Sequence, residues 1–184
     1  MQRGLLIAGL VLILDILTKQ LVLMFAFLLP NKVWPILNIV LAWNPGMSFS
    51  LFSNAQTPLV IGSFTIPPDV YLPTAFTMIA IVAIFIFLNW LRQEANPLAQ
   101  SGLGLIIGGA AGNMLDRLQH GAVIDFIDFH WGIHHFPAFN VADSAISVGV
   151  ALLFCSEIVQ YVKKRNNRKK ANSQNKDNHD EKTA

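Results

Sequence analysis

Four long apolar stretches dominate the pattern of hydrophobic and polar positions along this chain. They cover residues 4–27, 70–91, 98–118 and 141–162. A helix of ~20 mainly apolar residues is long enough to cross a bilayer. The pattern therefore predicts a membrane all-α fold, in which a bundle of four transmembrane helices forms a single integral membrane domain over residues 1–162.

The connection between the first two spans, residues 28–69, has a different pattern. Two β-prone runs, Ile36–Trp43 and Leu59–Ile66, are separated by turn residues, and nearby aromatic residues suit a membrane–water interface. We interpret this segment as a small extracytoplasmic β-like flap or cradle between helices 1 and 2. A flexible loop anchored by aromatic residues is the alternative that the pattern leaves open.

Composition and charge support a membrane protein and suggest its orientation. Of the 184 residues, 53% are hydrophobic and only 13% are charged, which is too apolar for an ordinary soluble domain. Arg3 and Arg92 flank two spans, and a basic cluster follows the fourth. Because basic residues collect in cytoplasmic loops, we expect a multi-pass protein with both termini in the cytoplasm. The basic and polar tail, residues 163–184, is predicted to be disordered.

Between Gly108 and Asp143, ionisable side chains stand beside membrane-grade hydrophobicity. Asp116, Asp125 and Asp143 lie at or between the ends of two apolar segments. A charged group near hydrocarbon is costly, so its presence is a hypothesis of function. Two carboxylates at a low-dielectric boundary can share a proton, and one can then activate water. The alternatives are a helix N-cap for Asp143 and a solvated loop acid for Asp125.

Other polar residues lie near the same span ends. Asp116 and Arg117 could form an ion pair or a pair of interface anchors, and Arg117 could also orient a carbonyl or a carboxylate. Asn113 and Asn140 supply both hydrogen-bond donors and acceptors there.

Two patterns inside the spans predict helix contacts. Asp15 and Lys19 are four residues apart, so they share a helix face and can pair toward the bundle interior. Gly104, Gly108 and Gly112 recur at four-residue spacing, which lets helix backbones approach closely in a membrane. The single cysteine, Cys155, excludes an intramolecular disulfide and is predicted to be buried within the fourth span.

The histidines raise the question of a metal site. Four of them, His120, His130, His134 and His135, follow the third span, but their spacing matches no strong zinc motif. We interpret them as interfacial residues and expect no metal and no cofactor. No pattern of a serine nucleophile is present either, and we expect no nucleic-acid partner.

An ordered set of motifs resembles the lipoprotein signal peptidase (signal peptidase II) family, the membrane aspartyl peptidases of bacteria. The motifs are Asp15-Ile-Leu-Thr-Lys19, Asn44-Pro-Gly-Met-Ser-Phe-Ser50, the run from Gly108 to Arg117, Gly121-Ala-Val-Ile-Asp-Phe126 and Phe136-Pro-Ala-Phe-Asn-Val-Ala-Asp143. The similarity extends in order over about residues 4–160. It departs at Met47, where the family tends to have a smaller residue, which leaves the shape of the flap in doubt.

The resemblance implies an activity, a location and a set of roles. It implies a hydrolase of the bacterial cytoplasmic (inner) membrane that cleaves prolipoproteins before their diacylglyceryl-modified Cys and releases the signal peptide. It further implies a monomer in contact with membrane lipid, whose active site lies near the extracytoplasmic face. The implied catalytic residues are Asp125 and Asp143, the substrate-binding residues are Asn44, Asn113, Arg117 and Asn140, and the structural supports are Asp15, Lys19 and Asp116.

Two other classes of function compete with this one. A proton- or ion-coupled transporter would also carry intramembrane acids, but it predicts acids near the midplane and often a repeat between halves. Here the acids gather toward one face and no repeat is evident. A non-catalytic assembly factor would not need both Asp125 and Asp143. Asn substitutions at the two acids distinguish these classes.

Overall fold

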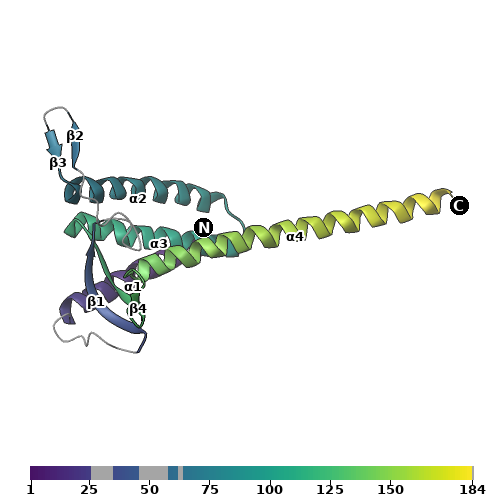
Figure 1. Cartoon of the computed structure of the whole chain (residues 1–184). Coiled ribbons are helices and arrows are strands. Elements are labelled where there is room, and N and C mark those ends of the chain that lie inside the picture. Colours follow the sequence, from purple (N-terminus) through teal and green to yellow (C-terminus); the bar gives the residue numbers. More distant parts are fainter. Residues whose placement is uncertain (26–34, 46–57, 62–63, 184) are drawn as a thin grey trace.

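The computed structural model describes residues 1–25, 35–45, 58–61 and 64–183. Four of its helices are long and apolar enough to cross a membrane: α1 (Gln2–Phe25), α2 (Pro68–Gln93), α3 (Pro97–His120) and α4 (Val141–Thr183). The four predicted spans are therefore confirmed, with ends displaced by a few residues in α1, α2 and α3. In Figure 1 the helices gather into a bundle, and the strands lie at the end of the bundle away from the two termini.

Helix α3 is the central helix of the bundle, because it packs against α1, α2 and α4. The predicted glycine stripe explains how α1 comes so close. A Cβ added at Gly104 would strike the backbone of Gly4, one at Gly108 would strike Ala8, and one at Gly112 would strike the Asp15 carboxylate. Because Gly112 has no side chain, the Asp15 carboxylate of α1 can lie directly against α3 at this position.

Local signals define where α3 begins and ends. Asn96 caps its start by accepting a hydrogen bond from the Leu98 N–H at 2.9 Å, and Pro97 occupies the first turn. Its last turn ends at Gly121, which has φ +70° and donates its N–H to the Arg117 carbonyl. This left-handed turn reverses the chain and starts the next strand directly beside the end of α3.

Helix α4 is longer than its apolar segment. It continues to Thr183 and projects beyond the other helices (Figure 1), whereas residues 163–184 were predicted to be disordered. The composition allows the helix to continue, because no glycine or proline follows Gly149. Residues 163–184 include six lysines and two arginines, which favour helix, together with five asparagines, which do not.

Three of the strands form a sheet that joins the connection between α1 and α2 to the connection between α3 and α4. Strand β1 (Leu37–Asn44) pairs antiparallel with β4 (Val123–Trp131), so that Asn44 lies opposite Val123, and β4 pairs with β5 (His134–His135). A separate hairpin consists of β2 (Leu59–Ile61) and β3 (Phe64–Ile66). The predicted sheet-like cradle is present, and its central strand, β4, comes from the connection between α3 and α4. Met47 and the rest of 46–57 lie outside the described residues.

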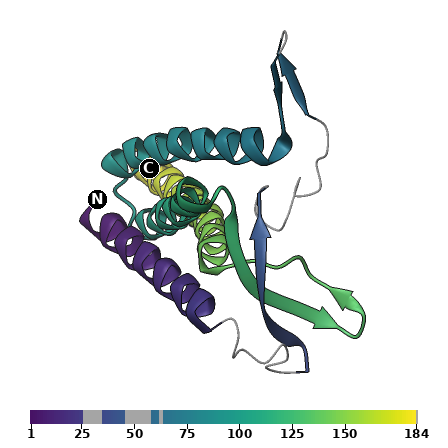
Figure 2. The ribbon, with the colours of Figure 1, turned by 90° about the vertical axis from the view of Figure 1, so that its left-hand side faces the viewer.

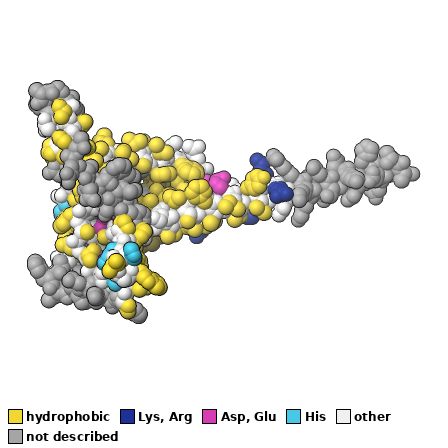
Figure 3. All heavy atoms as spheres, in the orientation of Figure 1, with side chains coloured by type: hydrophobic (Ala, Val, Ile, Leu, Met, Phe, Trp, Pro, Cys, Tyr) yellow, Lys and Arg dark blue, Asp and Glu magenta, His cyan; other side chains and the backbone are white. Residues whose placement is uncertain are grey.

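The outside of the bundle is apolar. Hydrophobic side chains cover most of the bundle surface in Figure 3, and Phe85 and Phe154 are among the most exposed. Such a surface suits contact with acyl chains. Cys155 is also exposed on α4, so the prediction of a buried thiol was wrong. An apolar helix in a membrane has a lipid face as well as a packed face, and sequence composition does not distinguish them.

Candidate active site

The polar site begins with a buried lysine that links α1 to α3. The Lys19 ammonium lies 2.7 Å from a carboxylate oxygen of Asp15 and 2.7 Å from one of Asp116. It also donates to the amide oxygen of Asn113 at 3.1 Å. Because Asp15 and Lys19 are both buried, the predicted pair is confirmed and faces the bundle interior. Lys19 thus holds two acids and one amide of two different helices.

Asp116, for which an ion pair with Arg117 was one interpretation of the sequence, has its ion pair with a residue of another helix. Asp116 pairs with Lys19 and also accepts the Ile124 N–H at 3.1 Å. The Arg117 guanidinium instead lies over the Phe76 ring, 5.6 Å from its centroid, and donates to the Asn113 carbonyl. Side chains of consecutive helix residues point in different directions, so Asp116 faces α1 and Arg117 faces α2. Arg117 remains within electrostatic range of Asp143 and Asp125.

The start of α4 is capped by two residues other than Asp143. Asn140 accepts the Asp143 N–H at its side-chain oxygen, at 2.9 Å, and Asp15 accepts the Ala142 N–H at 2.9 Å. The N-cap alternative for Asp143 was therefore wrong. Because Asn140 and Asp15 already bind the first backbone N–H groups, the Asp143 carboxylate does not serve as the helix cap and can point into the site.

Asp125 lies on β4 with its side chain fully buried, at 0% exposure. The amides of Asn44 and Asn140 each donate to one of its carboxylate oxygens, at 2.9 and 2.8 Å. Burial, and then the nearby charge of Asp143, raises the pKa of Asp125 to about 7, although the two amide donors oppose that shift. The alternative of a solvated loop acid was wrong, because β1 and β4 enclose this residue.

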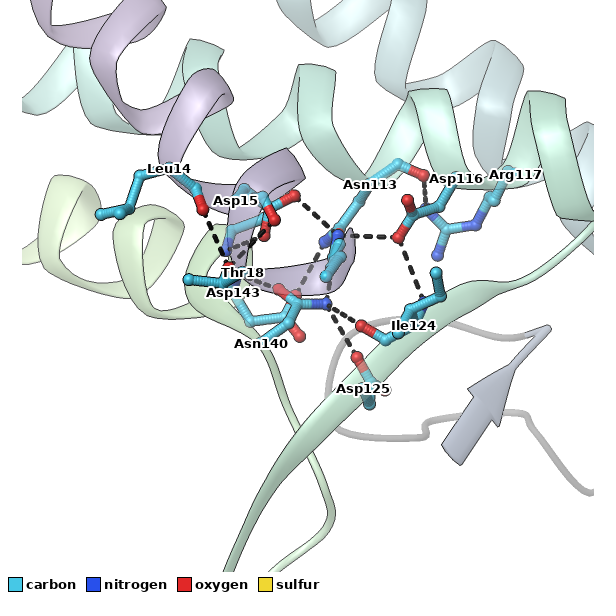
Figure 4. A network of polar contacts seen from close by, with 12 residues as sticks. Leu14, Asp15, Thr18, Asn113, Asp116, Arg117, Ile124, Asp125, Asn140 and Asp143 are labelled. Atoms are coloured by element: carbon cyan, nitrogen blue, oxygen red, sulfur yellow. Dashed lines mark hydrogen bonds and ion pairs between the residues drawn. The ribbon is translucent and has the colours of Figure 1, made fainter. Parts of the chain in front are cut away.

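Asn113 and Asn140 connect the two acids. Asn113 donates to a carboxylate oxygen of Asp143 at 2.8 Å, and Asn140 donates to Asp125 while its own oxygen accepts the Asp143 N–H. Asn140 also donates to Asn113 at 3.1 Å. Figure 4 shows these side chains converging from α1, α3, α4 and β4. The arrangement brings two carboxylates from distant parts of the chain to one buried position and can hold one proton between them.

All the predicted site residues thus belong to one connected network. Its members are Asp15, Lys19, Asn44, Asn113, Asp116, Arg117, Asp125, Asn140 and Asp143. Sequence reasoning missed Phe76 beneath Arg117, since an apolar residue in a span gives no signal of its own. It also missed the Ile124 and Ala142 N–H groups, since backbone donors cannot be assigned before the tertiary contacts are known.

The histidines lie outside this network, at the sheet. His135 contacts the Asp128 carboxylate at 2.8 Å, and Asn38 of β1 donates to the same carboxylate at 2.9 Å. The ring of His130 stacks on that of His135, with centroids 5.1 Å apart. Asn38 and the two histidines together hold the pKa of Asp128 below its usual value. These contacts tie β5 and β1 to β4.

The fold and this network define the class of protein, a multi-pass membrane protein with a buried acidic site at one end of its bundle. Comparisons with known proteins identify its family. The family described as Signal peptidase (SPase) II matches residues 7–159. A "Lipoprotein signal peptidase" of Rhodopseudomonas palustris is 42% identical over 83% of this chain and 90% of its own, and one of Shewanella halifaxensis is 40% identical over 82% of each.

Solved structures agree with this assignment. Two bacterial membrane enzymes superpose with TM-scores of 0.67 and 0.64 at 28% and 29% identity, and the matches cover 89% and 85% of this chain and 92% of each of theirs. The chain belongs to the signal peptidase II family and is a peptidase.

Proposed function

We propose that this chain is an aspartyl endopeptidase that cleaves the peptide bond before the diacylglyceryl-modified Cys of prolipoproteins. The observation that carries the proposal is the juxtaposition of Asp125 and Asp143, both buried and joined through Asn113 and Asn140. The relatives named above are lipoprotein signal peptidases, which supports this choice of substrate. We further propose that the enzyme acts as a monomer in the cytoplasmic membrane, with its site at the extracytoplasmic face.

In the proposed reaction the two acids have different roles. Asp125 carries the proton, because its pKa of about 7 leaves a substantial fraction of it protonated near neutral pH. Asp143 accepts a proton from water, and the Asn113 amide, which donates to its carboxylate at 2.8 Å, holds it in place. The oxygen of that water adds to the scissile carbonyl carbon while Asp125 protonates the carbonyl oxygen. The carbon–nitrogen bond then breaks, and the amine leaves with the proton held by Asp143. As the carbonyl group re-forms, one hydroxyl of the intermediate returns a proton to Asp125.

An apolar path for a lipid-modified substrate leads toward this site. A pocket between the helices is lined by Phe76, Ile79 and Ala80 of α2, Ala110, Asn113 and Arg117 of α3, and Ile146 of α4. Its outer part is apolar, and its polar part belongs to the network of the two acids. Helix α2 packs on α3, so acyl chains could reach the pocket from the bilayer beside these two helices. We propose that Asn44, Asn113, Arg117 and Asn140 position the substrate there.

The test replaces each acid by its amide. Asp125→Asn and Asp143→Asn should each reduce cleavage of a diacylglyceryl prolipoprotein in detergent by more than about 10³-fold, because each removes a proton-transfer group. Mass spectrometry of the products identifies the bond that is cut. Melting temperatures close to that of the parent would show that both variants are folded. Retained cleavage by either variant would overturn the two-acid mechanism.

A further inference from the structure

The tip of the β4–β5 hairpin is apolar although it extends away from the protein core. Trp131 is 83% exposed and Ile133 is 89% exposed. All residues from Trp131 to Pro137 are exposed, and they include Phe136. An exposed group of large apolar side chains on a structured element indicates a binding surface.

The hairpin presents these side chains on a fixed backbone. Trp131 pairs with His134 across a turn at Gly132, whose φ is +62°, and the Phe136 N–H donates to the Phe129 carbonyl at 2.7 Å. The contact of His135 with Asp128, at 2.8 Å, fastens β5 to β4. The tip is therefore a rigid turn whose polar side chains bind one another and whose apolar side chains point outward.

The direction of the sheet decides which partner the tip can meet. Figures 1 and 2 show that β4 runs across the bundle and extends beyond its side, at the level where α3 ends. In Figure 3 the same region carries histidines among hydrophobic side chains. Since α3 spans the membrane and β4 begins three residues after its end, the strand lies at the membrane surface and carries its tip over the surrounding leaflet.

We propose that Trp131 and Ile133 insert into the outer part of the leaflet at the active-site face and anchor the sheet in the lipid. Tryptophan favours this interfacial region because its ring is apolar and its N–H can bond to headgroups or water. The apolar surface of the spans continues into the tip, so the lipid that surrounds the spans can also cover the tip. The anchor is independent of which peptide bond the enzyme cuts, although β4 also carries Asp125.

Site-directed spin labelling tests the depth of the tip in bilayer nanodiscs. Ile133→Cys is labelled in a Cys155→Ser background, since Cys155 is the only native cysteine. Phe154→Cys on the lipid-facing surface of α4 and Ala95→Cys in the exposed turn between α2 and α3 are the controls. Oxygen concentrates in the bilayer, and a water-soluble nickel chelate stays outside it. We expect the Ile133 label to collide more often with oxygen, as at Phe154, and the Ala95 label to collide more often with nickel.

Two outcomes would overturn the proposal. A label at Ile133 that behaves like the label at Ala95 would place the tip in water, and one shielded from both reagents would mean that protein covers it. A second measurement avoids the label. Brominated lipids should quench the parent more than Trp131→Phe, and shallow bromines should account for that difference. Equal quenching of the two folded proteins would also exclude insertion.

Discussion

The molecule buries two groups of charged side chains side by side, and they are built on different principles. Around Lys19, one cation lies between the carboxylates of Asp15 and Asp116. Around Asp125 and Asp143, the side-chain amides of Asn44, Asn113 and Asn140 donate to the carboxylates. In the first group each carboxylate has the same cation as its ion-pair partner, and a backbone N–H bonds to each as well. The second keeps two like charges close together, which raises the free energy of the doubly ionised form.

This difference separates architecture from chemistry within one connected network. In the group around Lys19, a substitution is expected to lower stability, because removal of one member leaves the others buried and unpaired. A pair of acids that cannot both ionise easily stores a proton near neutral pH, which is the property that acid–base catalysis needs. Asn113 bonds to both groups, because its oxygen accepts from Lys19 and its amide donates to Asp143. Its orientation in the second group is thereby set by the first.

The largest expected difference between the two groups is in how an Asp→Asn substitution changes activity and stability. Asp125→Asn should abolish cleavage while the melting temperature stays equal to that of the parent or rises, because the amide removes a buried charge beside Asp143. Asp15→Asn is the matched change in the other group and should lower the melting temperature, since Lys19 would lose a partner. Paired thermal and activity assays check this. Equal thermal losses in both variants would show that the two groups do not differ.

The next largest effect is expected at the cation. Lys19→Met keeps a long side chain but leaves Asp15 and Asp116 without their shared partner, at an expected cost of about 3–5 kcal/mol in the free energy of unfolding. Reversible unfolding in mixed micelles measures it. Activity should fall as well, since Asn113 loses the contact that orients its amide. A variant as stable as the parent would mean that Lys19 is not the centre of this group.

Glycine substitutions test whether close helix packing supports the group around Lys19. Gly112→Ala places a methyl group against the Asp15 carboxylate, and we expect it to cost ~1–3 kcal/mol by overpacking. Gly9→Ala is the control on α1, because no other side chain or backbone lies near the added Cβ. The two melting temperatures should differ, with Gly9→Ala close to the parent. A loss of stability in both would point to a general effect of alanine instead.

The parts of the structure that sequence predicted are those with local causes. The spans follow from runs of apolar residues, and the Asp15–Lys19 pair follows from four-residue helical spacing. The pairing of β1 with β4 could not be predicted in this way, because Asn44 and Val123 are far apart in sequence and their register depends on how the helices pack. The same holds for Asp116, whose partner on α1 is brought near only by the glycine stripe.

The two acids themselves were found by chemical reasoning and by family resemblance together. The free-energy cost of a charged group near hydrocarbon marked Asp116, Asp125 and Asp143 equally as unusual. The family resemblance separated Asp116 from the other two acids, and the structure supplies the physical reason, because Lys19 forms an ion pair with Asp116. An acid is assigned to architecture or to chemistry by its partner, and the partner is a tertiary contact.

The smallest expected effect is the pH dependence of stability, and it distinguishes the two groups without loss of a side chain. The pKa of Asp125 rises from 3.8 to about 7 on folding, so the folded state binds the extra proton between these values. The stability that the proton contributes is fully present below pH ~4 and is lost as the pH rises through about 7. The melting temperature of the parent should therefore be lower at pH 8 than at pH 5.5, and the slope should be shallower in Asp125→Asn. A slope unchanged by that substitution would show that another group binds the proton, and Asp128 is excluded because its pKa is lowered.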